Sequence, residues 1–539
     1  MKISTILDKI DENQLFVPAF QREFVWSREN VKQLISSLIK EYPTGTILTW
    51  ETNNPPELKG EWKYTSSQGA IKLILDGQQR ITSLYFLVRN KIPPYYKEDE
   101  IKKDPRGLYV KIDQNPVDLQ YYKAKTMDNN PCWINISDVF QRNVRSKDVV
   151  RAMENKGIEV SRELDDLIDD NFKKIENILE RDFAEQTIPV KASLKEAIDI
   201  FYIVNASGVN LTDAELALAQ ISGYWPEARS LFKEKLSELK KEGFTFELDF
   251  IVYILLAISH HIGSDMTKLH DSSNKSKIQN IWQIISSDTL DYVLNLLKQY
   301  CHIESRKEIN YVYALIPMIA FIFKNNNRLS DVQIKQMIRW FLYSQIKERY
   351  LSQLGSKLDR DIKIIYENAE PFKVLIDEIQ SERHLQIKPE DFIGKMVTNP
   401  LFNLMKMYFK SVNAVCLGTG SGLSKNIGKK YELDNDHIFP WAKLRDAGYD
   451  KSSTFKYALA QELTNRELLV ASENRWRKSD TSAHEYLSEV KQRFPYALEL
   501  QCIPDDEELW NIERYEDFLQ KRREMLSEKL NSFIEQFNI

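Results

Sequence analysis

The sequence predicts a multidomain protein that is mainly α-helical with α+β portions. Three observations support this fold class. The chain has 539 residues, enough for several domains at roughly 100–200 residues each. It contains only 17 glycines and 18 prolines, which disfavours a loop-rich or collagen-like protein and favours helices. Short strands and helices alternate in the first part of the chain, whereas residues 216–400 show helical periodicity almost throughout.

The elements of the first part follow from local signals. Ser27 is a typical N-cap residue, and apolar residues recur after it at helical spacing until a proline and a glycine end the helix. Residues 46–50 and 71–75 are apolar runs that favour strands. The second run leads into a turn at 76–80, and we expect a helix after it. This order suits an anion site, because the first amides of a helix point toward a ligand.

Helices dominate the rest of the chain. Residues 192–205 are expected to be helical, and Thr212 with Glu215 forms a capping box that begins the next helix. Continuous apolar stretches then predict buried helices, and a highly charged final helix is expected to cover the C-terminal domain. These three predicted helices span residues 250–258, 312–323 and 506–537.

The composition excludes several classes of protein. With 42% hydrophobic and 28% charged residues, the chain cannot be mainly disordered. A net charge of −5 gives no overall basic field, so nucleic-acid binding would depend on local patches. The four cysteines contain no C-x-x-C pair, which argues against a disulfide framework or a cysteine zinc site and favours a reducing compartment.

No part of the sequence predicts a membrane segment. The longest apolar run, 311–323, is interrupted by Pro317 and is too short to span a bilayer. The N-terminal residues lack the apolar stretch of a secretory signal. We therefore expect a cytoplasmic protein with no membrane partner.

The most informative segment, residues 431–440, reads YELDNDHIFP. Hydrolysis of a phosphodiester needs a divalent metal that stabilises charge on the phosphate and a base that activates water. Asp436 and Asn474 offer hard oxygen ligands, which suit Mg²⁺ or Mn²⁺. His437 can accept a proton near neutral pH, and Asn465 can tie the loop to the backbone. The basic residues that can hold DNA phosphates are Arg475, Arg477 and Lys478.

An alternative interpretation makes His437 a buried loop histidine and Asp436 a helix cap. The downstream elements N-x-x-L-L and E-N-x-x-x-K favour a nuclease site. The segment resembles the HNH, or ββα-metal, nucleases, and the D-H-I-x-P variety at the C-terminus of GmrSD-type restriction endonucleases. The resemblance covers about residues 401–539. It implies that Asp436 and Asn474 hold the metal, that His437 is the general base and that Asn465 is structural; Asp434 is a further candidate ligand.

A second group of polar residues lies near the N-terminus. The segment VPAFQREFVW at 17–26 is followed by DGQQR at 76–80 and by a third block at 201–211. A glycine permits close backbone approach to a phosphate, and arginines can clamp phosphate oxygens in a fork geometry. A structural polar network is the alternative interpretation. The candidate nucleotide-binding residues are Gln21, Arg22, Asp76, Gly77, Gln78, Gln79, Arg80 and Asn205.

These blocks resemble the N-terminal domain of the same GmrSD-type family, with its P-x-x-Q-R-x-x-x-W and D-G-Q-Q-R signatures. The resemblance covers about residues 5–220. It implies a ParB/sulfiredoxin-like fold that binds or hydrolyses a nucleoside triphosphate, with GTP, ATP, CTP and UTP all open. The family's third block often has a basic residue where this chain has Ile203. We therefore expect a ParB/sulfiredoxin-like domain at 1–215, a helical connecting domain at 216–400 and an HNH nuclease domain at 401–539.

Together these features predict a metal-dependent DNA endonuclease of anti-phage defence that is modification-dependent and gated by nucleoside triphosphate. Two alternatives stay open: a ParB-like nucleotide-switched DNA-binding protein without nuclease activity, and a nuclease directed at RNA. The sequence does not choose a DNA modification or decide between a monomer and a homodimer. His260, His261 and His270 lack a fourth metal ligand at suitable spacing, so we interpret the first two as core or capping residues.

Overall fold

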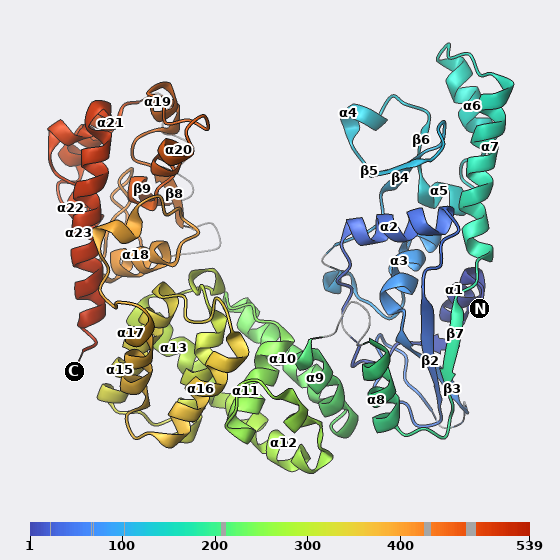
Figure 1. Cartoon of the computed structure of the whole chain (residues 1–539), viewed down its shortest axis with the longest axis horizontal. Coiled ribbons are helices and arrows are strands. Elements are labelled where there is room, and N and C mark those ends of the chain that lie inside the picture. Colours follow the sequence, from blue (N-terminus) through green and yellow to red (C-terminus); the bar gives the residue numbers. More distant parts are fainter. Residues whose placement is uncertain are drawn as a thin grey trace. The chain divides into compact units, whose positions relative to one another are not determined.

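The computed structural model describes residues 1–21, 23–65, 67, 69–101, 103–205, 212–424, 433–470 and 481–538. The chain divides into two compact units (Figure 1). The first comprises Met1–Leu231 with Leu269–Ser272, and the second comprises Phe232–Lys268 with Ser273–Ile539. The structure is mostly helical with small sheets, which confirms the predicted mixture of α and α+β parts.

A four-stranded sheet lies at the centre of the first unit, with strand order β1-β3-β2-β7. β2 is antiparallel to β3 and parallel to β7, and β1 is parallel to β3. Alternate residues of a strand point to opposite faces. Ile47 and Ile74 accordingly face one apolar core, and Trp50 and Leu73 face another, so both faces of the sheet are buried. The strands are β1 (Leu15–Phe16), β2 (Thr46–Thr52), β3 (Ile71–Asp76) and β7 (Ala184–Ile188).

Helices cover both faces of this sheet. Residues of α1, α2, α3, α5 and α7 complete the core on one face, and residues of α8 and α9 complete the core on the other. A second sheet, of order β5-β4-β6, packs against α5. Its strands are β4 (Leu108–Lys111), β5 (Asp118–Tyr121) and β6 (Trp133–Asn135). The helices of this unit are α1 (Ile3–Asp11), α2 (Arg28–Ile39), α3 (Gln78–Arg89), α4 (Ala124–Met127), α5 (Ile136–Phe140), α6 (Ser146–Asn155), α7 (Arg162–Glu176), α8 (Leu194–Asn205) and α9 (Asp213–Tyr224).

Local signals predicted several of these elements correctly. Ser27 caps α2 by accepting a hydrogen bond from the amide of Asn30, and Thr212 with Glu215 forms the expected capping box of α9. The turn after β3 is shorter than predicted. Gly77, in the left-handed region at φ 91°, is the N-cap of α3, so the helix already begins at the next residue.

The second unit is built mainly from helices, which Figure 1 shows in green to red. α10 (Ala228–Lys241) crosses the boundary between the units. His260 ends α11, and His261 is its C-cap at φ 59° and stacks on Tyr366, which confirms the predicted capping position. The other elements are α11 (Leu248–His260), α12 (Lys275–Ile284), α13 (Leu290–Cys301), α14 (Leu315–Lys324), α15 (Asp331–Ile346), α16 (Leu354–Glu367), α17 (Pro371–Glu382), α18 (Pro400–Ser411), β8 (Leu433–His437), α19 (Trp441–Asp446), α20 (Thr454–Ala460), β9 (Arg466–Val470), α21 (Ala483–Arg493), α22 (Ala497–Leu500) and α23 (Tyr515–Glu535).

The last helix is shorter than the predicted range 506–537. α23 begins at Tyr515, and two separate 3₁₀ turns, Glu507–Trp510 and Ile512–Arg514, precede it. The indole of Trp510 is buried and donates to the carbonyl of Pro504 at 2.8 Å. This contact ties the first of the two turns to the segment that precedes it.

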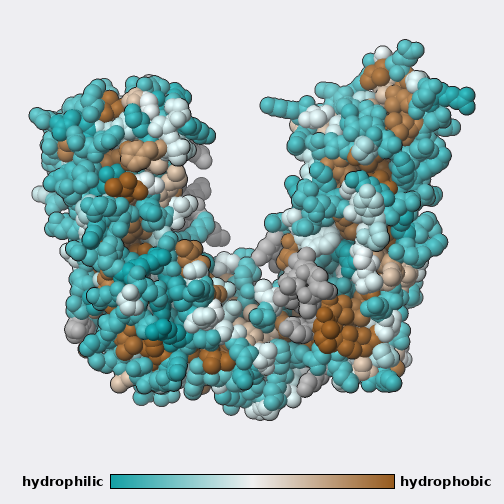
Figure 2. All heavy atoms as spheres, in the orientation of Figure 1, coloured by the Kyte–Doolittle hydropathy of each residue, from teal (hydrophilic) through white to brown (hydrophobic). Residues whose placement is uncertain are grey.

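The face of the molecule in Figure 2 is largely hydrophilic. Hydrophobic side chains gather over α8, where Ile203 is 69% exposed. Among the described residues, no helix is both long and apolar enough to cross a membrane.

Candidate functional site

The C-terminal motif lies on a pair of antiparallel strands. β8 and β9 pair from Leu433 opposite Val470 to His437 opposite Arg466. Asp434 and Asp436 share one face of β8 because side chains alternate along a strand. The side chain of Asp436 is 31% exposed and that of His437 is 14% exposed. Both groups therefore lie at the edge of the core, where solvent or a ligand can reach them.

Asn465 holds the loop that follows His437. Its side chain is fully buried, and its Oδ1 accepts from the amide of Phe439 at 2.9 Å. Its Nδ2 donates to the carbonyls of Phe439 and Ala460, both at 3.2 Å, and its own carbonyl accepts from the amide of Ile438. One buried amide thus satisfies backbone groups on two segments, which otherwise would have no partner in the core.

The contacts of His437 fix which ring nitrogen carries the proton. Nη2 of Arg466 donates to Oε1 of Gln461 at 2.7 Å, and a guanidinium can only donate, so this oxygen is an acceptor. Nε2 of His437 lies 3.3 Å from the same oxygen and must therefore be the N–H donor. Nη1 of Arg466 lies 3.2 Å from Nδ1. Nδ1 is accordingly the basic nitrogen of the ring.

Two arginines of α23 form hydrogen bonds with the residues around Asn465. Arg523 forms two parallel hydrogen bonds of 2.8 Å to the carboxylate of Glu462, which also accepts from the amide of Gly394. Arg522 is fully buried and donates to the carbonyls of Thr464, Arg466, Gln501 and Cys502. Burial lowers the pKa of Arg522 to about 10, so the side chain is still a cation at neutral pH.

A metal at Asp436 is chemically reasonable. The carboxylates of Asp434 and Asp436 lie on one face of β8. They offer the hard oxygen ligands that Mg²⁺ and Mn²⁺ prefer. One oxygen of Asp436 already accepts from the amide of His437 at 2.7 Å. Among the described residues, no group of three or more His, Cys, Asp or Glu side chains is arranged to hold a metal. The predicted ligand Asn474 and the basic residues Arg475, Arg477 and Lys478 lie outside the described residues.

In the first unit, two glutamines of the candidate nucleotide site bind backbone groups. Nε2 of Gln21 donates to the carbonyl of Leu75 at 2.7 Å. Gln79 accepts from the amide of Val25 at 3.0 Å and donates to the carbonyl of Glu23 at 2.9 Å. These bonds tie the segment after β1 to the end of β3 and the start of α3. Arg22, which directly follows Gln21, lies outside the described residues.

The remaining residues of the D-G-Q-Q-R sequence also have intramolecular partners. Arg80 donates to the carbonyls of Thr44 and Thr46 and lies 3.2 Å from the carboxylate of Asp76. Burial lowers the pKa of Arg80, and the charge of Asp76 opposes that effect. Gln78 is buried and donates to the hydroxyl of Tyr96. The side chain of Asp76 is 29% exposed, and Asn205 is the last residue of α8.

The described residues of the two motifs have different surroundings. In the first unit, the side chains of Gln21, Gln79 and Arg80 hold the β3–α3 turn, which is the role of a structural network. In the second unit, Asp436 and His437 lie beside each other at the end of a strand. Residues 3–222 match the family model of the N-terminal domain of GmrSD restriction endonucleases.

Over these residues the chain is similar to the GmrSD N-terminal domain. The GmrSD family is one of restriction endonucleases, enzymes that act on DNA. The chain is also similar to an uncharacterized protein of Methanocaldococcus jannaschii, at 23% identity over 98% of this chain and 95% of that protein.

Sequence reasoning did not identify Gln461, Arg466, Arg522 or Arg523. Gln461 and Arg466 lie within four positions of Asn465 in the sequence. This closeness to a motif residue is the one sequence feature that could have identified them. The two arginines follow more than 50 residues later in a charged helix, and no local pattern distinguishes them from solvent-exposed residues.

We expect replacement of Asn465 by alanine to destabilise the second unit by about 2–4 kcal/mol, since it leaves buried backbone groups unpaired. Chemical denaturation followed by tryptophan fluorescence measures this effect. Asn465→Asp is the matched variant, because it keeps the acceptor for Phe439 and loses both donors. Equal stability of Asn465→Ala and the parent chain would contradict the assigned role.

Proposed function

We propose that this protein is a metal-dependent DNA endonuclease of anti-phage defence, in which residues near the β8–β9 pair cut DNA. The observation that carries the proposal is the placement of His437. Its basic Nδ1 lies at a partly exposed strand end beside Asp436, in a chain whose N-terminal domain is similar to that of a restriction endonuclease family. The proposal extends to an HNH-type nuclease site and to dependence on DNA modification.

In this mechanism His437 is the general base. A water molecule displaces Nη1 of Arg466 from the lone pair of Nδ1, and Nδ1 then accepts a proton from that water. The water oxygen attacks the phosphorus, the bond to the leaving sugar oxygen breaks, and that oxygen takes a proton from solvent. Gln461 holds the proton on Nε2, and Arg466 orients the ring from the other side. Asp436 and Asn474 would hold Mg²⁺ or Mn²⁺, with Asp434 as a further ligand. Such an ion supplies charge stabilisation of the phosphate and of the leaving oxygen.

The second part of the proposal concerns the GmrSD-like N-terminal domain, which we infer gates cleavage by binding or hydrolysing a nucleoside triphosphate. The support is the left-handed Gly77 at the start of α3, a helix N-terminus that favours phosphate, and the partly exposed Asp76 beside it. The structural bonds of Gln21 and Gln79 are compatible with this function, because they fix the turn that would face the nucleotide.

The experiment that tests the function uses the purified full chain with plain and modified phage DNA, RNA, Mg²⁺ or Mn²⁺, and each nucleoside triphosphate in turn. Strand breaks that require metal support the nuclease. Dependence on a nucleotide or on a DNA modification identifies the gate. Nucleotide-dependent DNA binding without breaks on any substrate would instead support the nucleotide-switched DNA-binding protein.

We expect Gln461→Leu to lower the cleavage rate by about tenfold, because the ring of His437 loses the acceptor that selects its tautomer. The expected direct readout is a change in the ¹⁵N chemical shifts of His437, which distinguish the two tautomers. Gln520→Leu, an exposed change on α23, serves as the control. Unchanged shifts together with an unchanged rate would contradict the positioning role of Gln461.

We expect Asp76→Ala to lower nucleoside triphosphate turnover, or its coupling to cleavage, by at least about tenfold. Arg80→Ala should have a similar effect and should also destabilise the start of β2, because it removes the donor to Thr44 and Thr46. Steady-state turnover and thermal unfolding separate the two contributions. Asp8→Ala, which removes an exposed aspartate of the same unit, is the control. Wild-type turnover and coupling in both variants would exclude this site.

A further inference from the structure

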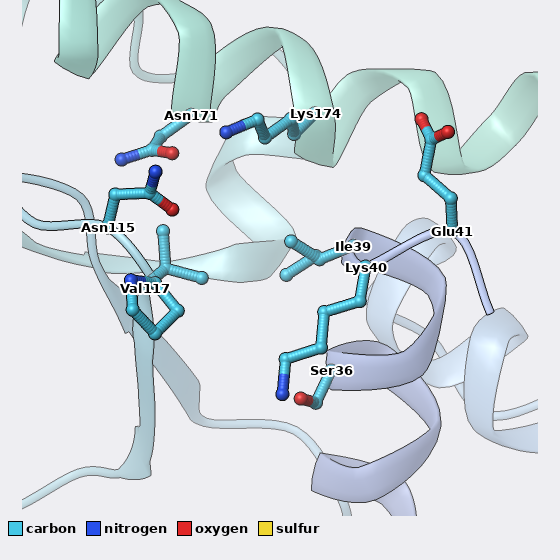
Figure 3. A pocket seen from close by; sticks show the side chains of 9 residues that line it. Ser36, Ile39, Lys40, Glu41, Asn115, Val117, Asn171 and Lys174 are labelled. Atoms are coloured by element: carbon cyan, nitrogen blue, oxygen red, sulfur yellow. The ribbon is translucent and has the colours of Figure 1, made fainter.

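A polar pocket lies in the first unit, and its lining includes none of the residues of the β3–α3 turn. Its volume is about 260 Å³. Figure 3 shows the side chains that line it, which come from the end of α2, from the loop after β4 and from α7. Ile39, Pro116 and Val117 contribute apolar surface, and the polar lining residues are Ser36, Lys40, Glu41, Asn115, Asn171 and Lys174.

Asn171 presents an unsatisfied acceptor in this pocket. The side chain is 99% buried, and its Nδ2 donates both hydrogens, to the carbonyl of Ile112 at 2.8 Å and to that of Gln114 at 3.1 Å. These two bonds fix the amide orientation, because a flipped amide would place its oxygen against two carbonyls. Oδ1 has no hydrogen-bond partner among the described residues. A buried acceptor of this kind calls for an N–H or O–H donor from a ligand.

The pocket also carries positive charge that no described side chain neutralises. Neither Lys40 nor Lys174 forms an ion pair with a residue that the structure describes, and the two lysines come from different helices. The one carboxylate of the lining, Glu41, pairs with Arg181. The local charge therefore favours an anion, and two unpaired cations match the charge of about −2 on a phosphate monoester.

We propose that this pocket binds a small phosphate-bearing ligand, with a ligand hydroxyl or amino group donating to Oδ1 of Asn171. The phosphate is held by Lys40 and Lys174, whose exposed amino groups point apart in Figure 3 and turn toward the ligand when it binds. The volume lies below the roughly 300–1,000 Å³ of pockets for drug-sized molecules, so it suits a sugar phosphate or one nucleotide unit. The phosphate can belong to a free metabolite or to a nucleic acid. The inference does not depend on whether the chain cuts DNA.

Calorimetric titration of the full chain with three probes tests the chemistry of the ligand. Ribose 5-phosphate offers a phosphate and hydroxyl donors, the methyl phosphate dianion offers only the phosphate, and ribose offers only the hydroxyls. We expect ribose 5-phosphate to bind at least about tenfold more tightly than either partial probe. If methyl phosphate bound as tightly as ribose 5-phosphate, the role assigned to Asn171 would be wrong. This comparison requires no substitution of Asn171, whose two donated hydrogen bonds hold the loop before Asn115 in place.

Two variants test the cations. We expect Lys40→Ala and Lys174→Ala each to weaken binding at least about fivefold, because each removes one charge-assisted contact. Lys173→Ala is the matched control, since Lys173 is the adjacent residue of α7, is 62% exposed and pairs with Asp169. Loss of affinity in Lys173→Ala equal to that in Lys174→Ala would overturn the site.

A duplex DNA with 5′-phosphate ends distinguishes the two sources of phosphate. If ribose 5-phosphate binds in a manner that depends on Lys40 and Lys174, the ligand is a free metabolite. If only the DNA binds with this dependence, the phosphate comes from nucleic acid. Absence of lysine-dependent binding by both probes would overturn the proposal.

Discussion

Replacement of His437 by alanine is expected to abolish DNA cleavage while the protein stays folded. The hydrogen bonds of the imidazole define its basic nitrogen, since Nε2 faces Gln461 and Nδ1 is the acceptor. A general base typically contributes roughly 10²–10⁴-fold to a rate, and we expect a loss of that size. The measurement is the single-turnover rate of strand cleavage at saturating metal and nucleotide.

The side chain of His437 makes contacts of 3.2–3.3 Å at the edge of the core, so its removal should cost little stability. His484→Ala is the matched control, because His484 lies in the same unit on α21 and packs beside Trp510. The control should cleave at the parent rate, and both variants should retain nucleotide binding. Cleavage by His437→Ala at the parent rate would contradict the site assignment.

Local sequence signals predicted much of the fold because the interactions they describe are local. The predicted N-cap at Ser27 and the predicted capping box at Thr212 each involve residues only three positions apart, and the structure has both. The apolar runs that predicted β2 and β3 likewise report burial on the two faces of the sheet. Alternation of Ile47 and Trp50 between two cores explains why β2 appears as a continuous apolar run.

The surroundings of the candidate sites could not be predicted in the same way. The sequence indicated that Gln21, Gln79 and Arg80 belong together, and they do lie at one turn. It could not show whether their polar atoms face a ligand or the backbone, since both arrangements use the same residue types. Their partners are backbone groups, which have no sequence signature. The partner of Gln21, for example, is the carbonyl of Leu75, 54 residues along the chain.

The same limit applies to the supports of His437. Arg522 and Arg523 are consecutive basic residues in a charged helix, where exposure to solvent is the usual expectation. Both are buried, because the carbonyls around residues 464–466 and the carboxylate of Glu462 provide acceptors. These acceptors come within hydrogen-bond distance of α23 only in the tertiary structure.

The Glu462–Arg523 pair is expected to have the largest effect on stability. The side chain of Glu462 is fully buried and that of Arg523 is 8% exposed, and two parallel bonds of 2.8 Å join them. Arg523→Ala would leave a buried carboxylate without its cation, which typically costs about 3–5 kcal/mol. We expect this loss to appear as faster hydrogen exchange in peptides that cover residues 462–470, and as a lower denaturation midpoint of the second unit.

A double-mutant cycle separates the pair from its neighbours. Glu462→Ala also removes the acceptor for Gly394, so this single variant should be destabilised as well. Removing both partners eliminates the unpaired charge, and the double variant should therefore lose about 1–3 kcal/mol less than the sum of the single variants. Lys521→Ala, an exposed change on the same helix, should leave exchange at 462–470 unchanged. Additive losses would show that the two groups stabilise the strand pair independently. In that case α23 would support His437 through its apolar contacts, such as Phe518 against Phe439, and not through this ion pair.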